Sequence, residues 1–338
     1  MEARIQGTFV DFSELTHRDH ELLGWSEEEW AEELTDMRAA GIDLVIMART
    51  MRFGCTYYYS NTFETHRETD FLSPFMRACA CTGMRVYLAG MISDAFFTAS
   101  NEDFARMMKR DISIYDTVFG ELLSAYAGHP GIAGLYVSHE VDNKNLAAPA
   151  RRGAARDFFG TLYGKLKDRT DLPILSSPFF TKDIGPAPFA RFWDDFLDRP
   201  MFDILAMQDG VGCDRDILPE DIPLYYEGLR DVLGRKGIAF WNNVETFSFN
   251  PGFRRSNFDR NKIWLHPAPL ERVDRQYKAG APFTEKTITW EYGHFLSRRQ
   301  VGADWYEAFK RWNLGLAGDA QGGAVNANGA RRTRTVKR

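Results

Sequence analysis

The chain has 338 residues, of which 44% are hydrophobic, 26% charged and 14% aromatic, and its formal net charge is −5. This length allows one domain with a large core, since α/β barrels exceed the usual domain size. Basic residues gather in 318–338, so the rest of the chain is more acidic than the whole, which argues against nucleic acid or an anionic membrane as the main partner.

The cysteines and the apolar pattern indicate a cellular setting. Cys79 and Cys81 are close in sequence, but no second pair repeats their spacing as a zinc site normally requires. We therefore expect free thiols in a reducing compartment, Cys55 and Cys213 included. There is no basic start followed by an apolar stretch, and no apolar run approaches the roughly 20 residues of a membrane span. These features favour a soluble cytoplasmic protein.

The first predicted elements are a strand, a helix and a second strand. Residues 5–12 form an apolar run that predicts a strand. A helix should follow, because Ser26 and Glu29 have the spacing of a capping box and Gly41 is a favourable helix end. Residues 42–48 then predict a second strand, which opens into a loop rich in arginine and tyrosine.

The same alternation continues along the rest of the chain. Eight strands alternating with eight helices imply a parallel sheet covered by helices, and this number of units fits a single-domain (β/α)8 TIM barrel of the α/β class. No Gly-x-Gly-x-x-Gly follows the first strand, and no cofactor is expected. We expect the barrel to span residues 1–316, and the Gly/Ala/Asn-rich residues 317–338 to form a disordered basic tail. The remaining strands are predicted at 84–92, 132–140, 172–177, 202–207, 238–245 and 287–290, and the remaining helices at 70–82, 101–126, 151–167, 189–197, 224–233, 270–278 and 303–314.

Two glutamates mark the predicted ends of the fourth and seventh strands. Glu140 lies in Tyr-Val-Ser-His-Glu-Val-Asp-Asn at 136–143, and Glu245 ends Asn-Asn-Val-Glu at 242–245. Barrel active sites lie at the C-terminal ends of the strands. Glycosidic bond hydrolysis needs two carboxyl groups, and many retaining glycosidases of barrel fold carry the acid/base after strand four and the nucleophile after strand seven. We therefore predict Glu140 as general acid/base and Glu245 as nucleophile, or as general base if the mechanism inverts.

Other side chains near the predicted strand ends are candidates for binding a carbohydrate substrate. Aromatic faces stack on the C–H surfaces of sugars, while polar groups bind hydroxyls. The same residues could instead have structural roles, such as pairing with a loop arginine or orienting a neighbour. None is assigned as a metal ligand in this interpretation. The candidates are Asp11, Arg49, Asp94, His139, Asp209, Asn243, Glu291 and His294, together with Trp241, Trp264, Trp290 and Tyr292.

Five segments carry a resemblance to a known family. They are GTFVDF at 7–12, GIDLVI at 41–46, GLYVSHEVD at 134–142, QDGVG at 208–212 and NVETF at 243–247. Together they resemble a bacterial TIM-barrel family that is grouped with glycoside hydrolases and catalogued as a domain of unknown function. The resemblance covers about residues 5–315 and implies the barrel and a glycosidase-like site, without a particular sugar. The chain differs from retaining barrels in which Asn precedes the acid/base, because His139 stands there.

Two other functions fit the same residues. One is a non-catalytic carbohydrate-binding barrel, since a fold does not fix a function. The other is a metal-dependent isomerase or hydrolase, which is weakened by the lack of His-x-His after the first strand and of a His-Glu-x-x-His helix. Its ligands would be drawn from Asp209, Glu245, Glu291, His139 and His294. A glycoside hydrolase remains the leading prediction, with retention favoured by analogy.

Overall fold

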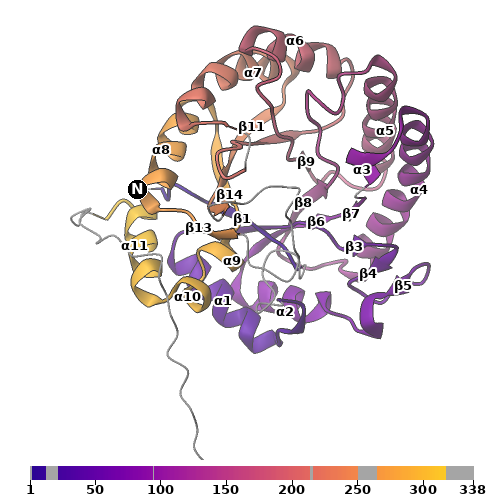
Figure 1. Cartoon of the computed structure of the whole chain (residues 1–338). Coiled ribbons are helices and arrows are strands. Elements are labelled where there is room, and N and C mark those ends of the chain that lie inside the picture. Colours follow the sequence, from indigo (N-terminus) through magenta and orange to yellow (C-terminus); the bar gives the residue numbers. More distant parts are fainter. Residues whose placement is uncertain (1, 13–21, 94, 214–215, 250–264, 317–338) are drawn as a thin grey trace, which may run out of the picture.

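The computed structural model describes residues 2–12, 22–93, 95–213, 216–249 and 265–316. Within these ranges, eight parallel strands close into a barrel with helices outside it (Figure 1). This confirms the predicted single-domain (β/α)8 TIM barrel. The tail expected at 317–338 lies outside the described residues. Around the barrel the strands run β1 (Gly7–Val10), β14 (Lys286–Trp290), β11 (Ala239–Glu245), β10 (Ile204–Gln208), β9 (Ile174–Ser176), β8 (Ile132–Val137), β6 (Arg85–Ala89) and β2 (Leu44–Met47).

Aromatic rings from several strands fill the barrel interior. Tyr87 of β6 and Trp241 of β11 meet across the barrel, with ring centroids 6.2 Å apart. Higher up, the ring of Phe9 contacts Tyr136 at 5.0 Å and Trp290 at 5.1 Å. Because side chains alternate between the two faces of a strand, these rings identify the inward-facing positions of β1, β6, β8, β11 and β14.

The barrel helices match the predicted ones to within a few residues at each end. In α1 (Glu27–Ala39), the Ser26 hydroxyl accepts the Glu29 N–H at 3.2 Å, and the Glu29 carboxylate accepts the Ser26 N–H at 2.8 Å. This confirms the capping box. No helix in the described part of the chain is long and apolar enough to cross a membrane. The other barrel helices are α2 (Leu72–Thr82), α4 (Asn101–Ala125), α5 (Pro149–Lys167), α6 (Pro186–Phe196), α7 (Ile222–Lys236), α8 (Leu270–Gly280) and α11 (Ala303–Asn313), with the short helices α3 (Ala95–Thr98), α9 (Tyr292–Phe295) and α10 (Arg298–Val301) between them.

Two small sheets extend the loops that follow the barrel strands, and neither was expected. The strand predicted at 84–92 is divided at Gly90, and the residues after it pair in a second sheet. At Gly90 an added Cβ would lie 2.1 Å from the Tyr115 ring of α4, so no side chain fits there. That sheet has the order β5 (Glu64–Thr65), β4 (Cys55–Thr56), β3 (Met51–Arg52), β7 (Met91–Ile92), while β12 (Phe247–Phe249) pairs with β13 (Leu265–Pro267).

The start and the end of the barrel are joined to each other. Strand β1 pairs with β2 on one side and with β14 on the other. The side chain of Asn313, at the end of α11, accepts the Ile5 N–H at 2.6 Å and donates to the carbonyls of Ile5 and Ala40 at 2.8 Å. The last helix is thus hydrogen-bonded to the backbone that leads into the first strand.

Candidate active site

Glu245 is the last residue of β11, and three side chains form hydrogen bonds with its main-chain N–H and carbonyl. Its N–H donates to Asp209 Oδ1 at 3.3 Å, and its carbonyl accepts Arg272 Nη2 at 3.0 Å and Gln276 Nε2 at 3.1 Å. In the parallel pairing, Glu245 lies opposite Trp290 and four residues above Trp241, so its side chain faces the barrel interior like theirs. It is 1% exposed.

The Glu245 carboxylate is bound through both of its oxygens. Oε2 accepts the backbone N–H of Cys213 at 2.9 Å, and Oε1 accepts the Cys213 thiol at 3.2 Å. The loop that follows β10 reaches this position because of its glycines. Gly210 has φ 73°, and a Cβ added to Gly212 would lie 2.8 Å from Glu245 Cβ and 2.7 Å from the Phe247 carbonyl. The QDGVG segment therefore brings a loop directly onto this carboxylate.

Glu140 lies three residues beyond the end of β8 and is half-buried. Its Oε1 accepts Gln208 Nε2 at 3.2 Å, and the same amide donates to the Ser177 carbonyl at 2.8 Å. Gln208 faces the interior, because it pairs in register with Asn243, whose amide donates to the Ser177 hydroxyl at 3.0 Å. Burial raises the pKa of Tyr136, and the charge of Glu140 acts in the same direction. Glu140 therefore faces the same interior as Glu245.

Asp11 and Arg49 form an ion pair beside these groups. Arg49 Nη2 lies 2.8 Å from Asp11 Oδ2, and both side chains are buried. Both charges act on the pKa of Tyr136, so the pair lies close to that phenol, with Asp11 raising the pKa and Arg49 lowering it. The structure thus brings Asp11, Arg49 and Asn243 to the interior end where Glu140 and Glu245 lie.

The two predicted tryptophans of the interior lie at different depths. Trp290 pairs with Glu245 and contacts Phe9, so it belongs to the upper layer. Trp241 pairs with Lys286, four residues earlier on each strand, and the ammonium of Lys286 lies 5.0 Å from its ring. Since a strand rises about 3.3 Å per residue, Trp241 lies roughly 13 Å below Glu245 in the floor of the barrel.

Asp209 points away from the barrel interior. It follows the inward-facing Gln208, and its Oδ2 accepts Gln276 Nε2 of α8 at 2.7 Å. Asp209 is fully buried, and this burial, together with the charge of Glu245, raises its pKa to about 8. The structure therefore places Asp209 behind β11, where it holds the Glu245 backbone.

Glu291 and Tyr292 also lie outside the barrel. Glu291 follows the inward-facing Trp290 and caps α9, since its Oε1 accepts the His294 N–H at 2.8 Å and contacts the His294 ring. The backbone N–H of Tyr292 donates to the Thr8 hydroxyl at 2.9 Å. All three predicted residues here, Glu291, Tyr292 and His294, are buried in the layer between β1, β14 and the helices.

His139 precedes Glu140 but faces the opposite way. Its Nε2 lies 3.1 Å from Asp111 Oδ2 of α4, and its ring stacks on Phe96 of α3 at 5.0 Å. Both members of the His139–Asp111 pair are buried. The structure does not bring His139 to the interior, and its contacts are those of a residue that packs α3 and α4 against the barrel.

The four acidic candidates at the strand ends do not lie on one side of the barrel wall. Glu140 and Glu245 face inward, whereas Asp209 contacts Gln276 of α8 and Glu291 caps α9, so both lie on the helix side. Asp94 and Trp264 lie outside the described residues.

Several residues that organise this end were not identified from the sequence. Gln208 could have been identified from its strand, because it lies an even number of residues from other inward-facing positions of β10. Arg272 and Gln276 lie one turn apart on the buried face of α8, where apolar residues are usual. Nothing in the sequence signals that Cys213 contacts Glu245, because that contact depends on the path of the loop.

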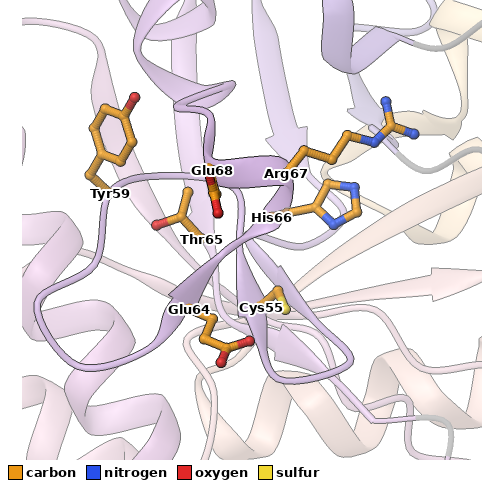
Figure 2. A pocket seen from close by; sticks show the side chains of 7 residues that line it. All are labelled: Cys55, Tyr59, Glu64, Thr65, His66, Arg67 and Glu68. Carbon is orange, nitrogen blue, oxygen red and sulfur yellow. The ribbon is translucent and has the colours of Figure 1, made fainter.

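A separate hollow lies on the small sheet that follows β2 (Figure 2). Its volume is about 680 Å³, and neither Glu140 nor Glu245 lines it. Across the described ranges, no group of three His, Cys, Asp or Glu side chains is placed to hold a metal ion. The hollow is lined by Cys55, Tyr59, Glu64, Thr65, His66, Arg67 and Glu68.

Residues 5–300 match a protein-family model described as Domain of unknown function (DUF4434). The chain belongs to this DUF4434 family. The match covers every barrel strand and confirms the resemblance that the sequence motifs indicated. A search of curated proteins found no significant match.

Solved structures similar to this DUF4434 protein include several that are described as glycosidases. A candidate alpha-L-fucosidase from Bacteroides thetaiotaomicron VPI-5482 is 21% identical with a TM-score of 0.74, covering 93% of this chain and 94% of that one. A GH18 chitinase from Pseudoalteromonas aurantia is 12% identical with a TM-score of 0.53, covering 91% and 99%. The GH29 alpha-L-fucosidase from Bacteroides thetaiotaomicron is 12% identical with a TM-score of 0.51, covering 91% and 71%. At these identities the similarity establishes the fold.

Proposed function

We propose that this DUF4434 protein is a glycoside hydrolase in which Glu140 and Glu245 act on one glycosidic bond. The observation that carries the proposal is the inward-facing carboxylate of Glu245, whose backbone and side chain are both hydrogen-bonded at the C-terminal end of a barrel. An immobilised carboxylate facing the interior suits attack on a fixed anomeric carbon. The similar solved barrels, which are described as fucosidases and a chitinase, support the substrate class.

The surroundings of the two glutamates favour different roles for them. Glu245 receives an N–H and an S–H donor, which stabilise its ionised form, and an ionised carboxylate is the nucleophile or base. Glu140 is half-buried, faces one amide donor and lies close to the buried phenol of Tyr136. It is therefore the group that gives a proton to the leaving oxygen and takes one from water.

In the retaining sequence that we favour, Glu245 attacks the anomeric carbon while Glu140 protonates the departing glycosidic oxygen. Glu140 then removes a proton from water, which attacks the same carbon and releases Glu245. The rings of Phe9, Tyr136 and Trp290 supply an apolar wall against which the C–H face of a sugar can pack. The Asp11–Arg49 pair places hydroxyl-binding groups beside that wall.

A panel of aryl glycosides tests this function, with α-L-fucosides screened first and N-acetylglucosaminides and mannosides next. NMR of the first-formed product gives the anomer and so decides between retention and inversion. The expected result is hydrolysis of one glycoside class with retention, lost in Glu245→Gln on every substrate and in Glu140→Gln on glycosides with poor leaving groups. Hydrolysis that survives unchanged in both folded variants would contradict the proposal.

A further inference from the structure

The Glu245 carboxylate is held by a single residue through two different donors. Cys213 gives its backbone N–H to Oε2 at 2.9 Å and its thiol S–H to Oε1 at 3.2 Å. Two donors that meet the two oxygens fix the carboxylate plane as well as its position. The close approach of Gly212 to the Glu245 side chain leaves little space for the loop to shift.

The chemistry of these donors favours one protonation state of Glu245. An S–H and an N–H can only donate here, so both bonds are strongest when the carboxylate is ionised. The second acid nearby is Asp209, whose pKa is raised to about 8 by burial and by the charge of Glu245. A negative charge on Glu245 thus disfavours a second negative charge on Asp209.

We propose that Cys213 is a positioning residue for catalysis, which orients the Glu245 carboxylate for attack on the anomeric carbon. This role rests on the proposed glycosidase function. The proposal gives a functional role to the QDGVG loop and to the free thiol of Cys213. The N–H contact belongs to the backbone, so only the thiol contact can be removed by substitution.

Two substitutions separate positioning from packing. Cys213→Ala removes the side-chain donor, and Cys213→Ser keeps a donor at the same position. In Cys213→Ala we expect kcat to fall about 10-fold with little change in KM, as expected for loss of one hydrogen bond to a charged group. Cys213→Ser should restore kcat, whereas a purely structural role would lower thermal stability and leave kcat of the folded enzyme unchanged.

Thiol alkylation tests the contact without measuring activity. Peptide mass spectrometry follows iodoacetamide labelling of Cys213, with the exposed Cys81 as an internal reference. A neighbouring carboxylate disfavours the thiolate, which is the reactive form. Labelling of Cys213 should therefore be several-fold faster in Glu245→Gln than in the wild type at the same pH, while labelling of Cys81 stays the same.

The labelling and kinetic experiments distinguish failure of the Cys213 contact from failure of the proposed function. Equal labelling of Cys213 in both proteins would overturn the contact itself. Faster labelling in Glu245→Gln, together with a wild-type protein that hydrolyses no glycoside, would overturn the proposed function and with it the catalytic role of Cys213. Hydrolysis with an unchanged kcat in Cys213→Ala would leave the glycosidase function standing and overturn the positioning role.

Discussion

Glu245 and Glu291 end neighbouring strands of the barrel, yet their surroundings differ completely. Glu245 pairs in register with Trp290, faces the interior and is bound by the loop after β10. Glu291 comes one residue after Trp290, faces the helices and caps α9. A shift of one position in register separates a candidate catalytic carboxylate from a helix cap. Proximity to a strand end is therefore a weaker guide to function than the side of the barrel wall on which a side chain lies.

The same substitution at both glutamates tests this comparison most directly. Glu245→Gln keeps the shape of the side chain but removes the nucleophile, so hydrolysis should fall by about 10³-fold or more on every substrate. Glu291→Gln should lower stability by about 1 kcal/mol through a weaker cap and change kcat only a few-fold. Steady-state kinetics and thermal melting of both variants provide the check. A Glu291→Gln variant as inactive as Glu245→Gln, with unchanged melting, would break the distinction between inner and outer faces.

Glu140 and Glu245 both face the interior, but their substitutions should have different effects. Glu140→Gln removes the proton donor, and hydrolysis of glycosides with poor leaving groups should fall by about 10²–10⁴-fold. An aryl glycoside with an acidic phenol departs without protonation, so its first step should be largely retained. Pre-steady-state release of the phenol measures that step. Equal losses on both kinds of substrate would argue that Glu140 is not the acid.

A further prediction is that Asp209, on the helix side of β11, carries a proton in the folded protein. Burial and the charge of Glu245 raise its folded-state pKa to about 8, above its ordinary value of 3.8, so the folded protein binds a proton that the unfolded chain has released between these pH values. The stability contributed by this proton is present below about pH 4 and is lost as pH rises through about 8. Asp209→Asn should remove this part of the pH dependence of the unfolding free energy, measured by denaturant titration at pH 5 and pH 8.

Glu33 provides a matched control for that measurement. It is buried on α1, and burial raises its pKa to about 7, so it acts in the same direction over a lower range. Glu33→Gln should flatten the curve mainly between pH 4.5 and 7. An Asp209→Asn variant that keeps the wild-type slope up to pH 8 would show that Asp209 is ionised in the folded protein.

The smallest effect on activity is expected at His139, although it adjoins Glu140 in sequence. His139→Leu removes the imidazole partner of the buried Asp111, which keeps its Arg110 contact, and should destabilise the fold by about 1–3 kcal/mol. The catalytic constants should stay within a few-fold of wild type, because the ring packs between helices. Steady-state kinetics below the melting temperature measure the catalytic constants, and thermal melting measures the loss of stability. A large fall in kcat without loss of stability would place His139 in the active site after all.

The barrel was predictable from sequence because its signals are local. Apolar runs fixed the order of the strands, and signals such as the Ser26–Glu29 capping box located helix ends within a few residues. The orientation of the strand-end residues was not predictable in the same way. Strand β8 ends at Val137, three residues before Glu140, and one residue of uncertainty in a boundary reverses the expected face. The Cys213 contact depends on a loop whose course follows from tertiary packing.

The hydrogen bonds that join Asn313 to Ile5 have a consequence for synthesis of the chain on the ribosome. These two residues are 308 positions apart, and β1 cannot gain its β14 partner until nearly the whole barrel has been translated. At about 5–20 residues per second, this interval is roughly 15–60 s. During that time one hydrogen-bonding edge of β1 has no partner from its own barrel, and an open edge can pair with another nascent chain. The shortness of β1, which has four residues, limits how much edge is exposed to that encounter.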